Sequence, residues 1–166
     1  MTEQALALDP ENTLYLDLKD GRVVIEMRED LAPKHVARIK ELVRQGFYDG
    51  LVFHRVMAGF MAQTGDPDGN GTGGSGMNLP AEFSREKYVR GTVGMARSND
   101  INSADSQFYI MFERSEFLDG KYTVWGQVVQ GMEFVDNIKK GEGPNGAVLG
   151  TPDIIVRMQV AADAQE

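Results

Sequence analysis

Two short runs of alternating apolar and polar residues near the amino terminus place the strongest constraint on the fold. In 13–18 three leucines fall on one face, because successive side chains of a strand point to opposite sides. The same alternation returns in 23–27, after an Asp-Gly pair at 20–21. Two such runs around Asp-Gly are typical of a β-hairpin, so the sequence predicts a pair of antiparallel strands here.

Further short segments have strand character, and only two segments have the period of a helix. The strands are expected at Leu51–Met57, Phe60–Gln63, Thr92–Ala96, Gln107–Phe112, Thr123–Val129 and Ile154–Val160. The helices are expected at Pro33–Gln45 and, shorter, at Met132–Lys139. This pattern favours a mainly β fold, an eight-stranded antiparallel closed β-barrel capped by two α-helices. No repeat or shift in composition marks a boundary, so a single domain over 1–166 is predicted.

The composition is that of a globular domain with an excess of acidic residues. Of 166 residues, 42% are hydrophobic and 25% are charged, which is ordinary for a chain that buries a sizeable core. The formal net charge of −8 repels phosphate groups, so neither nucleic acid nor a membrane is an expected partner. Cysteine is absent, which excludes a disulfide framework and a thiol nucleophile. The segment 1–11 holds no apolar run of signal-peptide length, and the expected location is the cytoplasm.

A glycine-rich segment at 65–76 carries two motifs that suggest a ligand site. Asp66–Gly71 matches the first half of a calcium loop, but the twelfth position requires Glu and is Met77 here. Gly69–Gly74 fits G-x-G-x-x-G, but no βαβ unit surrounds it. Calcium or nucleotide binding is therefore the weakest alternative. The two histidines are too few for most zinc sites, and His35, on the predicted helix, is expected to be solvated.

The segment Phe53–Gln63 is the one best suited to chemistry. It predicts a strand, a tight turn and a second strand, which brings Arg55 and Gln63 onto neighbouring strands beside methionine and aromatic side chains. This arrangement allows a groove with one cationic donor, one amide and an apolar floor. The alternative is that Arg55 is a surface side chain and that Phe60 and Met61 belong to the core. Spacing alone favours that alternative.

Several separated motifs then occur in a fixed order along the chain. They are Phe53-His54-Arg55, Gly59-Phe60-Met61-Ala62-Gln63, Gly71–Gly74, Gly94-Met95-Ala96, Ser106-Gln107-Phe108, Phe117–Gly120 and Trp125–Val128. Together they resemble the cyclophilin family, over roughly residues 13–160. The resemblance implies an eight-stranded barrel with two helices. It also implies an enzyme that accelerates rotation about the peptide bond before proline and assists protein folding. It implies no cofactor or metal, and the family is usually monomeric.

The resemblance also implies roles for individual residues. Arg55 matches the arginine that donates to the proline nitrogen and Gln63 the residue that orients it, so both are expected catalytic residues. The expected substrate-binding residues are Phe60, Met61, Tyr109 and Leu118 around the proline ring, Ala96 and Arg97 beside the substrate backbone, and Gln107, Phe117 and Tyr122 in the groove. Strand alternation supports Gln107 and Tyr109 on one face, with Phe108 in the core. Proline-containing peptides and unfolded or flexible protein segments are the expected partners.

Four positions depart from the usual family pattern. Tyr109 stands where phenylalanine is usual, which adds a hydroxyl to the pocket rim, and Phe117 stands where many members have tryptophan. Because that indole helps to bind cyclosporin, only weak cyclosporin binding is expected. Tyr122 replaces a common histidine, and Arg97 replaces a smaller polar residue, which favours acidic or polar groups beside the proline. The competing hypothesis is a binding module without turnover, against which the intact Arg55 argues.

Overall fold

A computed structural model describes residues 9–164. The prediction that no signal peptide is present concerns residues 1–11, and most of these lie outside the described residues. The strands are β1 (Thr13–Leu18), β2 (Gly21–Met27), β3 (Arg55–Met57), β4 (Met61–Thr64), β5 (Thr92–Met95), β6 (Phe108–Met111), β7 (Val124–Gln130) and β8 (Arg157–Val160). The helices are α2 (Pro33–Arg44) and α3 (Met132–Asp136), with short 3₁₀ helices η1 (Pro10–Asn12), η2 (Glu116–Leu118), η3 (Pro144–Gly146) and η4 (Ala161–Asp163). In this part of the chain no helix has the length and apolar character needed to cross a membrane.

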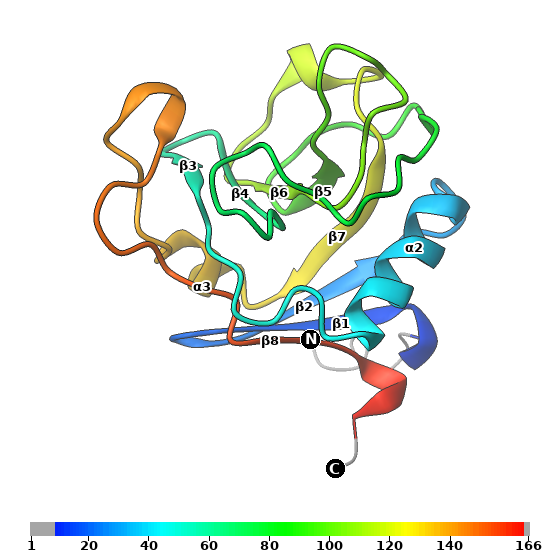
Figure 1. Ribbon diagram of the computed structural model, residues 1–166. Helices are drawn as coiled ribbons and strands as arrows, with labels where there is room; N and C mark the ends of the chain where they lie inside the picture. Colours follow the sequence, from blue (N-terminus) through cyan, green and yellow to red (C-terminus); the bar gives the residue numbers. More distant parts are fainter. Residues whose placement is uncertain (1–8, 165–166) are drawn as a thin grey trace.

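The described strands form one antiparallel sheet in the order β3-β4-β6-β5-β7-β2-β1-β8. The predicted hairpin is confirmed, since β1 pairs with β2 from Thr13 opposite Glu26 to Leu18 opposite Gly21. Gly21 leaves room for α3, because a Cβ atom there would lie 2.6 Å from the ring of Phe134. The sheet curls strongly, with β3 to β6 above β1, β2 and β8, and with β7 running between the two groups (Figure 1).

The predicted closure of the barrel is wrong. The two end strands, β3 and β8, do not form a ladder with each other in the described chain. A ladder needs several residues in matching register on both strands. Here the chain before β3 meets the chain before β8 at one isolated bridge, between Val52 and Ile154. Three backbone hydrogen bonds surround this bridge: Phe53 N to Asp153 O at 2.9 Å, Ile155 N to Leu51 O at 2.8 Å and Gly50 N to Ile155 O at 2.7 Å. The fold is therefore an open, curled eight-stranded sheet.

The concave interior of the sheet holds the main apolar core. Phe108 on β6 and Trp125 on β7 have no exposed surface and meet edge to face, with ring centres 5.5 Å apart. Helix α2 covers one end with an apolar face formed by Val36, Ile39, Leu42 and Val43. Alternation along β6 turns Phe108 into this core and Tyr109 into a second apolar cluster on the opposite face, as predicted. The two faces of one strand thus serve different purposes.

His35 is buried in α2, which contradicts the prediction that it is solvated. Its side chain has no exposed surface, and its Nδ1 atom lies 2.6 Å from Oε1 of Glu82. The same carboxylate accepts the backbone N–H groups of Lys34 and His35, at 3.1 and 2.9 Å. Ala32 at the N-cap offers no side-chain acceptor, so Glu82 satisfies amide groups that the helix leaves unpaired. Helical periodicity cannot reveal a partner 47 residues away.

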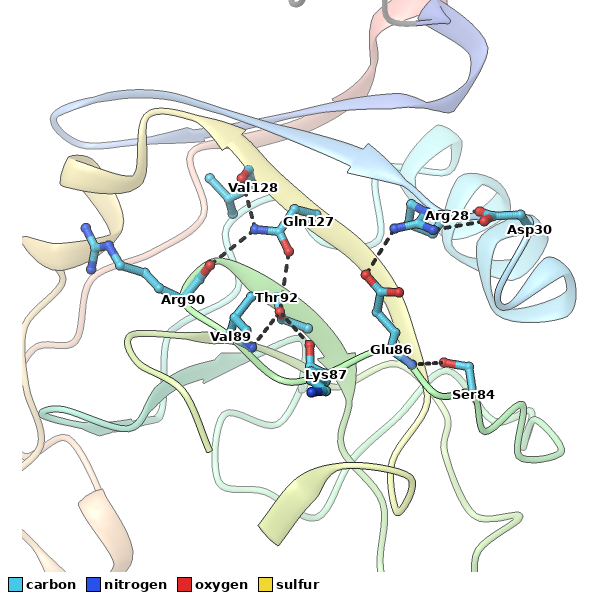
Figure 2. A network of polar contacts seen from close by, with 10 residues as sticks. All are labelled: Arg28, Asp30, Ser84, Glu86, Lys87, Val89, Arg90, Thr92, Gln127 and Val128. Carbon is cyan, nitrogen blue, oxygen red and sulfur yellow. Dashed lines mark hydrogen bonds and ion pairs between the residues drawn. The ribbon is translucent and has the colours of Figure 1, made fainter. Parts of the chain in front are cut away.

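A polar network fastens the loop before β5 to β7 and to Arg28, the residue that follows β2 (Figure 2). Gln127 on β7 donates from Nε2 to the carbonyl of Arg90 at 3.2 Å. On the other side of the same loop, Glu86 accepts from Nη1 of Arg28 at 3.3 Å. The loop between these two attachments carries Tyr88, which is a fully buried member of the second apolar cluster. The network therefore fixes a residue that supports the candidate site.

Candidate active site

Arg55 and Gln63 lie directly opposite each other on β3 and β4. The turn between the strands is closed by a 2.9 Å hydrogen bond from Phe60 N to Met57 O, so the predicted strand, turn and strand are confirmed. Directly opposite residues of an antiparallel pair point to the same face. This register brings Nη1 of Arg55 to 3.0 Å from Oε1 of Gln63.

The protein uses only part of the donor capacity of Arg55. Its Nε atom donates to the carbonyl of Asn145 at 2.8 Å, Nη1 donates to Gln63, and Nη2 faces the sulfur of Met57 at 3.7 Å. A guanidinium carries five N–H groups, so two remain for a substrate. None of these partners is an acid, and no ion pair between described residues includes Arg55. The side chain is held in place while its charge stays uncompensated.

Asn145 is a site residue that the sequence analysis missed. It lies within η3 and adopts the left-handed backbone conformation, with φ 57° and ψ 24°. Asparagine tolerates this region better than most residues, and Pro-Asn-Gly at 144–146 is a turn signal. The sequence signal thus indicates a turn. It does not show that the carbonyl of this turn meets Arg55, which lies 90 residues earlier.

Gln63 begins a chain of hydrogen-bonded amides. Its Nε2 atom donates to Oε1 of Gln107 at 2.8 Å, and Nε2 of Gln107 donates to the carbonyl of Gly73 at 3.0 Å. Each amide has its nitrogen engaged further along the chain, so the oxygen of Gln63 is turned toward Arg55. This chain of amides connects β4, the residue before β6 and the glycine-rich segment. The side chain of Gln63 is only 8% exposed, which keeps water from competing for these contacts.

A cavity of about 220 Å³ opens beside Arg55. It is lined by Arg55, Phe60, Met61, Gln63, Ala96, Arg97, Tyr109, Phe117, Leu118 and Tyr122. The structure therefore brings together ten of the eleven residues that the sequence analysis assigned to the site. The eleventh, Gln107, lines an adjoining cavity of about 310 Å³, which shares Gln63, Ala96 and Arg97 with the first. The two cavities meet along these shared residues.

The cavity beside Arg55 has a buried apolar floor and an exposed aromatic rim. Met61, Tyr109 and Leu118 are each at most 5% exposed. Phe117 is 64% exposed and packs on Phe60, with ring centres 5.7 Å apart. Since buried side chains keep fixed positions and exposed ones adapt, the floor sets the shape of the cavity and the rim sets access to it.

The prediction that the hydroxyl of Tyr109 lies at the pocket rim is wrong. The hydroxyl is turned into the protein and donates to the hydroxyl of Tyr88 at 3.3 Å. Burial raises the pKa of Tyr109 well above its ordinary value, so the phenol stays neutral. Gly94 on β5 makes room for the pair, because a Cβ atom there would lie 2.6 Å from the Tyr88 oxygen. The hydroxyl that tyrosine adds at position 109 is thus accommodated behind the pocket.

The glycine-rich segment is organised by its own carboxylate. Asp66 has no exposed surface and accepts backbone N–H groups from Asp68 at 2.8 Å, from Asn70 at 3.0 Å and from Gly71. Burial acts to raise the pKa of Asp66, but these hydrogen bonds lower it overall. Its oxygens therefore face amide donors, which argues against a calcium loop. Within residues 9–164 no group of three acidic or histidine side chains could hold a metal ion.

The fold and site define a class of protein in which an open, curled antiparallel sheet carries an apolar pocket beside a guanidinium. Comparison with known proteins identifies the class further. The family model described as "Cyclophilin type peptidyl-prolyl cis-trans isomerase/CLD" matches residues 13–160. The chain belongs to this family of peptidyl-prolyl cis-trans isomerases.

Individual relatives agree with this assignment. A probable peptidyl-prolyl cis-trans isomerase of Brucella suis is 58% identical over 98% of this chain and 89% of its own length. A cyclophilin from Hirschia baltica has a similar structure, with a TM-score of 0.82 and 29% identity over 95% of this chain and 77% of that one. A Cryptosporidium parvum cyclophilin-type isomerase, determined in the presence of the dipeptide Ala-Pro, has a TM-score of 0.81 and 26% identity. That match covers 89% of this chain and 98% of that one.

Proposed function

We propose that Arg55 is the group that catalyses rotation of Xaa-Pro bonds in this enzyme, with the proline ring in the 220 Å³ cavity. One observation carries the proposal: an uncompensated guanidinium with two unused N–H groups faces an apolar pocket of ring-binding character. The Cryptosporidium relative studied with Ala-Pro supports a proline-containing ligand. Peptides and unfolded or flexible protein segments are the proposed substrates.

The chemistry follows from the electronic structure of the peptide bond. Partial double-bond character gives rotation a barrier of about 18–20 kcal/mol. A hydrogen bond from Arg55 to the proline nitrogen localises the lone pair that the double bond needs. The nitrogen accepts such a bond best when the peptide is twisted, so the donor stabilises the transition state more than either planar ground state. Arginine suits this role because its donor fork is planar and permanently charged.

The neighbouring residues have supporting roles in the proposal. Gln63 and Asn145 each accept a hydrogen bond from the guanidinium and so fix its orientation. The direction of its remaining N–H groups is thereby fixed as well. Met61, Tyr109 and Leu118 enclose the proline ring, and the backbone at Ala96 and Arg97 lies beside the substrate chain, as the resemblance implies. Pre-positioned groups of this kind do not have to reorganise during the reaction.

The wider setting is proposed from the sequence. An acidic chain without cysteine fits a reducing cytoplasm, where the enzyme would act as a monomer that assists protein folding. The exposed Phe117 at the rim replaces the indole found in many relatives, so we propose that cyclosporin binds only weakly.

The test is the cis-to-trans relaxation rate of an Ala-Pro peptide, measured by exchange NMR with wild type and with Arg55→Ala. We expect strong acceleration by wild type and a loss of about 100-fold in the variant, which corresponds to ~3 kcal/mol of transition-state stabilisation. Arg90→Ala is the matched control, because it removes an arginine paired with Asp136 outside the cavity. A folded Arg55→Ala protein with wild-type rates would remove the proposal, and an inactive folded wild type would favour the binding-module hypothesis.

A further inference from the structure

Arg97 occupies the boundary between the two adjoining cavities. It lines both the 220 Å³ cavity beside Arg55 and the 310 Å³ cavity beside Gln107. Its guanidinium lies over the ring of Tyr122, 4.5 Å from the ring centre, in a cation–π arrangement. A substrate segment that extends from the first cavity into the second must therefore pass this side chain.

The charge of Arg97 is held in place but not neutralised. Nε and Nη2 both donate to the carbonyl of Lys121, at 3.2 and 2.7 Å, and Nη1 donates to the carbonyl of Ser98 at 2.8 Å. These contacts use three of five N–H groups and include no carboxylate. Two N–H groups, on the two terminal nitrogens, remain for a ligand. A pre-positioned fork of this kind matches a carboxylate better than a flexible lysine would.

This arrangement differs from that of most arginines in the chain. Within the described residues, six arginines form ion pairs with acids: Arg22, Arg28, Arg38, Arg44, Arg90 and Arg114. Arg55 and Arg97 contact only neutral groups, although the whole chain carries a net charge of −8. The candidate groove thus concentrates unpaired positive charge in an acidic protein.

One acid does line the second cavity, and its environment limits where an anion can bind. Asp105 accepts the backbone N–H and the hydroxyl of Ser75, at 2.7 and 2.6 Å, and the N–H of Gly76 at 3.1 Å. A substrate carboxylate placed beside Asp105 would face that charge. At the shared boundary it would instead meet the unused N–H groups of Arg97.

We propose that Arg97 is a specificity-determining residue that favours substrates with an acidic side chain flanking the proline. The inference rests on the proposed function, because it assigns a preference to the same groove. The carboxylate would accept hydrogen bonds from the two unused N–H groups of Arg97 at the boundary of the cavities. A lysine in the same place would be repelled and a glutamine would be intermediate.

The test compares isomerisation rates for peptides that differ only in one residue, Glu, Gln or Lys, on either side of an Ala-Pro unit. We expect wild type to show a kcat/KM about threefold to fivefold higher for Glu than for Lys on one flank, as for a partly exposed charge pair. Arg97→Ala should bring the ratio close to one, and Arg97→Glu should invert it. Added salt should reduce the wild-type ratio, because exposed charges are screened.

The matched control is Arg157→Ala, which removes one positive charge from an exposed position on β8 that lines neither cavity. It should leave the Glu-to-Lys ratio unchanged. A purely structural role of Arg97 would slow all peptides equally, so the ratio separates selection from folding. Equal wild-type rates for Glu and Lys on both flanks would overturn this inference while leaving the isomerase proposal intact. A wild type inactive on every peptide would overturn both.

Discussion

Neighbouring residues of β6 face two environments with opposite physical character. Phe108 points into the sheet interior, where it has no exposed surface and contacts the rings of Tyr48 and Trp125. Tyr109 points to the outer face, where it lines the cavity beside Arg55. The interior is apolar and shielded from solvent, while the outer face combines an apolar floor with hydrogen-bonded polar side chains. Strand alternation thus lets one short element support stability on one side and the site on the other.

The largest expected effect is on the interior side. Phe108→Ala removes a fully buried ring, and the lost burial with the remaining cavity should lower the free energy of unfolding by about 3–5 kcal/mol. Urea denaturation measures this change. If the variant does not fold, Phe108→Leu should unfold at a lower urea concentration than wild type, at a cost of about 1 kcal/mol.

The adjacent outward residue supplies the contrast. Tyr109→Phe removes only a hydroxyl that donates to Tyr88 at 3.3 Å, so we expect a loss of about 0.5–1.5 kcal/mol. The ring, and with it the pocket floor, stays in place. A loss in Tyr109→Phe as large as that in Phe108→Ala would contradict the division between the two faces.

The next effect is on the outer face and concerns rate more than stability. Gln63→Ala removes the amide between Arg55 and Gln107 and leaves both without their partner. Loss of one orienting hydrogen bond should lower the isomerisation rate by about tenfold. The rate of Ala-Pro relaxation, measured beside a urea denaturation curve, separates this loss from unfolding.

Gln63→Glu is the informative companion to that variant. Its carboxylate still accepts from Arg55, but it cannot donate to Gln107 and would neutralise the nearby charge. If the amide chain acts by orienting an uncompensated guanidinium, Gln63→Glu should be as slow as Gln63→Ala or slower. A glutamate variant with the wild-type rate would show that only an acceptor is required.

Local patterns predicted the parts of this fold that depend on nearby residues. The β1–β2 hairpin followed from alternation around Asp-Gly, helix α2 from its apolar period, and the opposite facing of Phe108 and Tyr109 from the strand period. The predicted closure of the barrel was wrong, because closure depends on the register between two segments about 100 residues apart. No local pattern encodes that register.

The candidate site required a different kind of information. Phe60 lies in the turn before β4, outside strand alternation, so its place in the pocket came only from the resemblance. Asn145 and Glu82 were missed because their contacts, with Arg55 and with His35, join segments far apart in sequence. Turn signals and charge identify such residues as loop residues. Only the folded structure shows which groups they meet.

The smallest expected effect concerns His35, the buried histidine of α2. Burial lowers the pKa of His35, although its hydrogen bond with Glu82 opposes the shift. The folded state therefore takes up a proton at this site less readily than the unfolded state, in which the pKa is near 6.5. The stabilising contribution is fully present above pH 6.5 and is lost as pH falls through the lower folded pKa. Burial lowers the pKa of His54 as well, so it contributes in the same direction.

Replacing one histidine separates the two contributions. We expect the free energy of unfolding of wild type to decrease between pH 7 and pH 5, and His35→Gln to show a shallower decrease, with the remainder due to His54. Urea denaturation at a series of pH values measures both slopes. Burial acts to raise the pKa of Glu82, but its hydrogen bonds lower the pKa below its ordinary value overall. The contribution of Glu82 to stability is therefore lost only at more acidic pH. Equal slopes in wild type and His35→Gln would show that the pair formed by His35 on α2 and Glu82 does not govern this pH dependence.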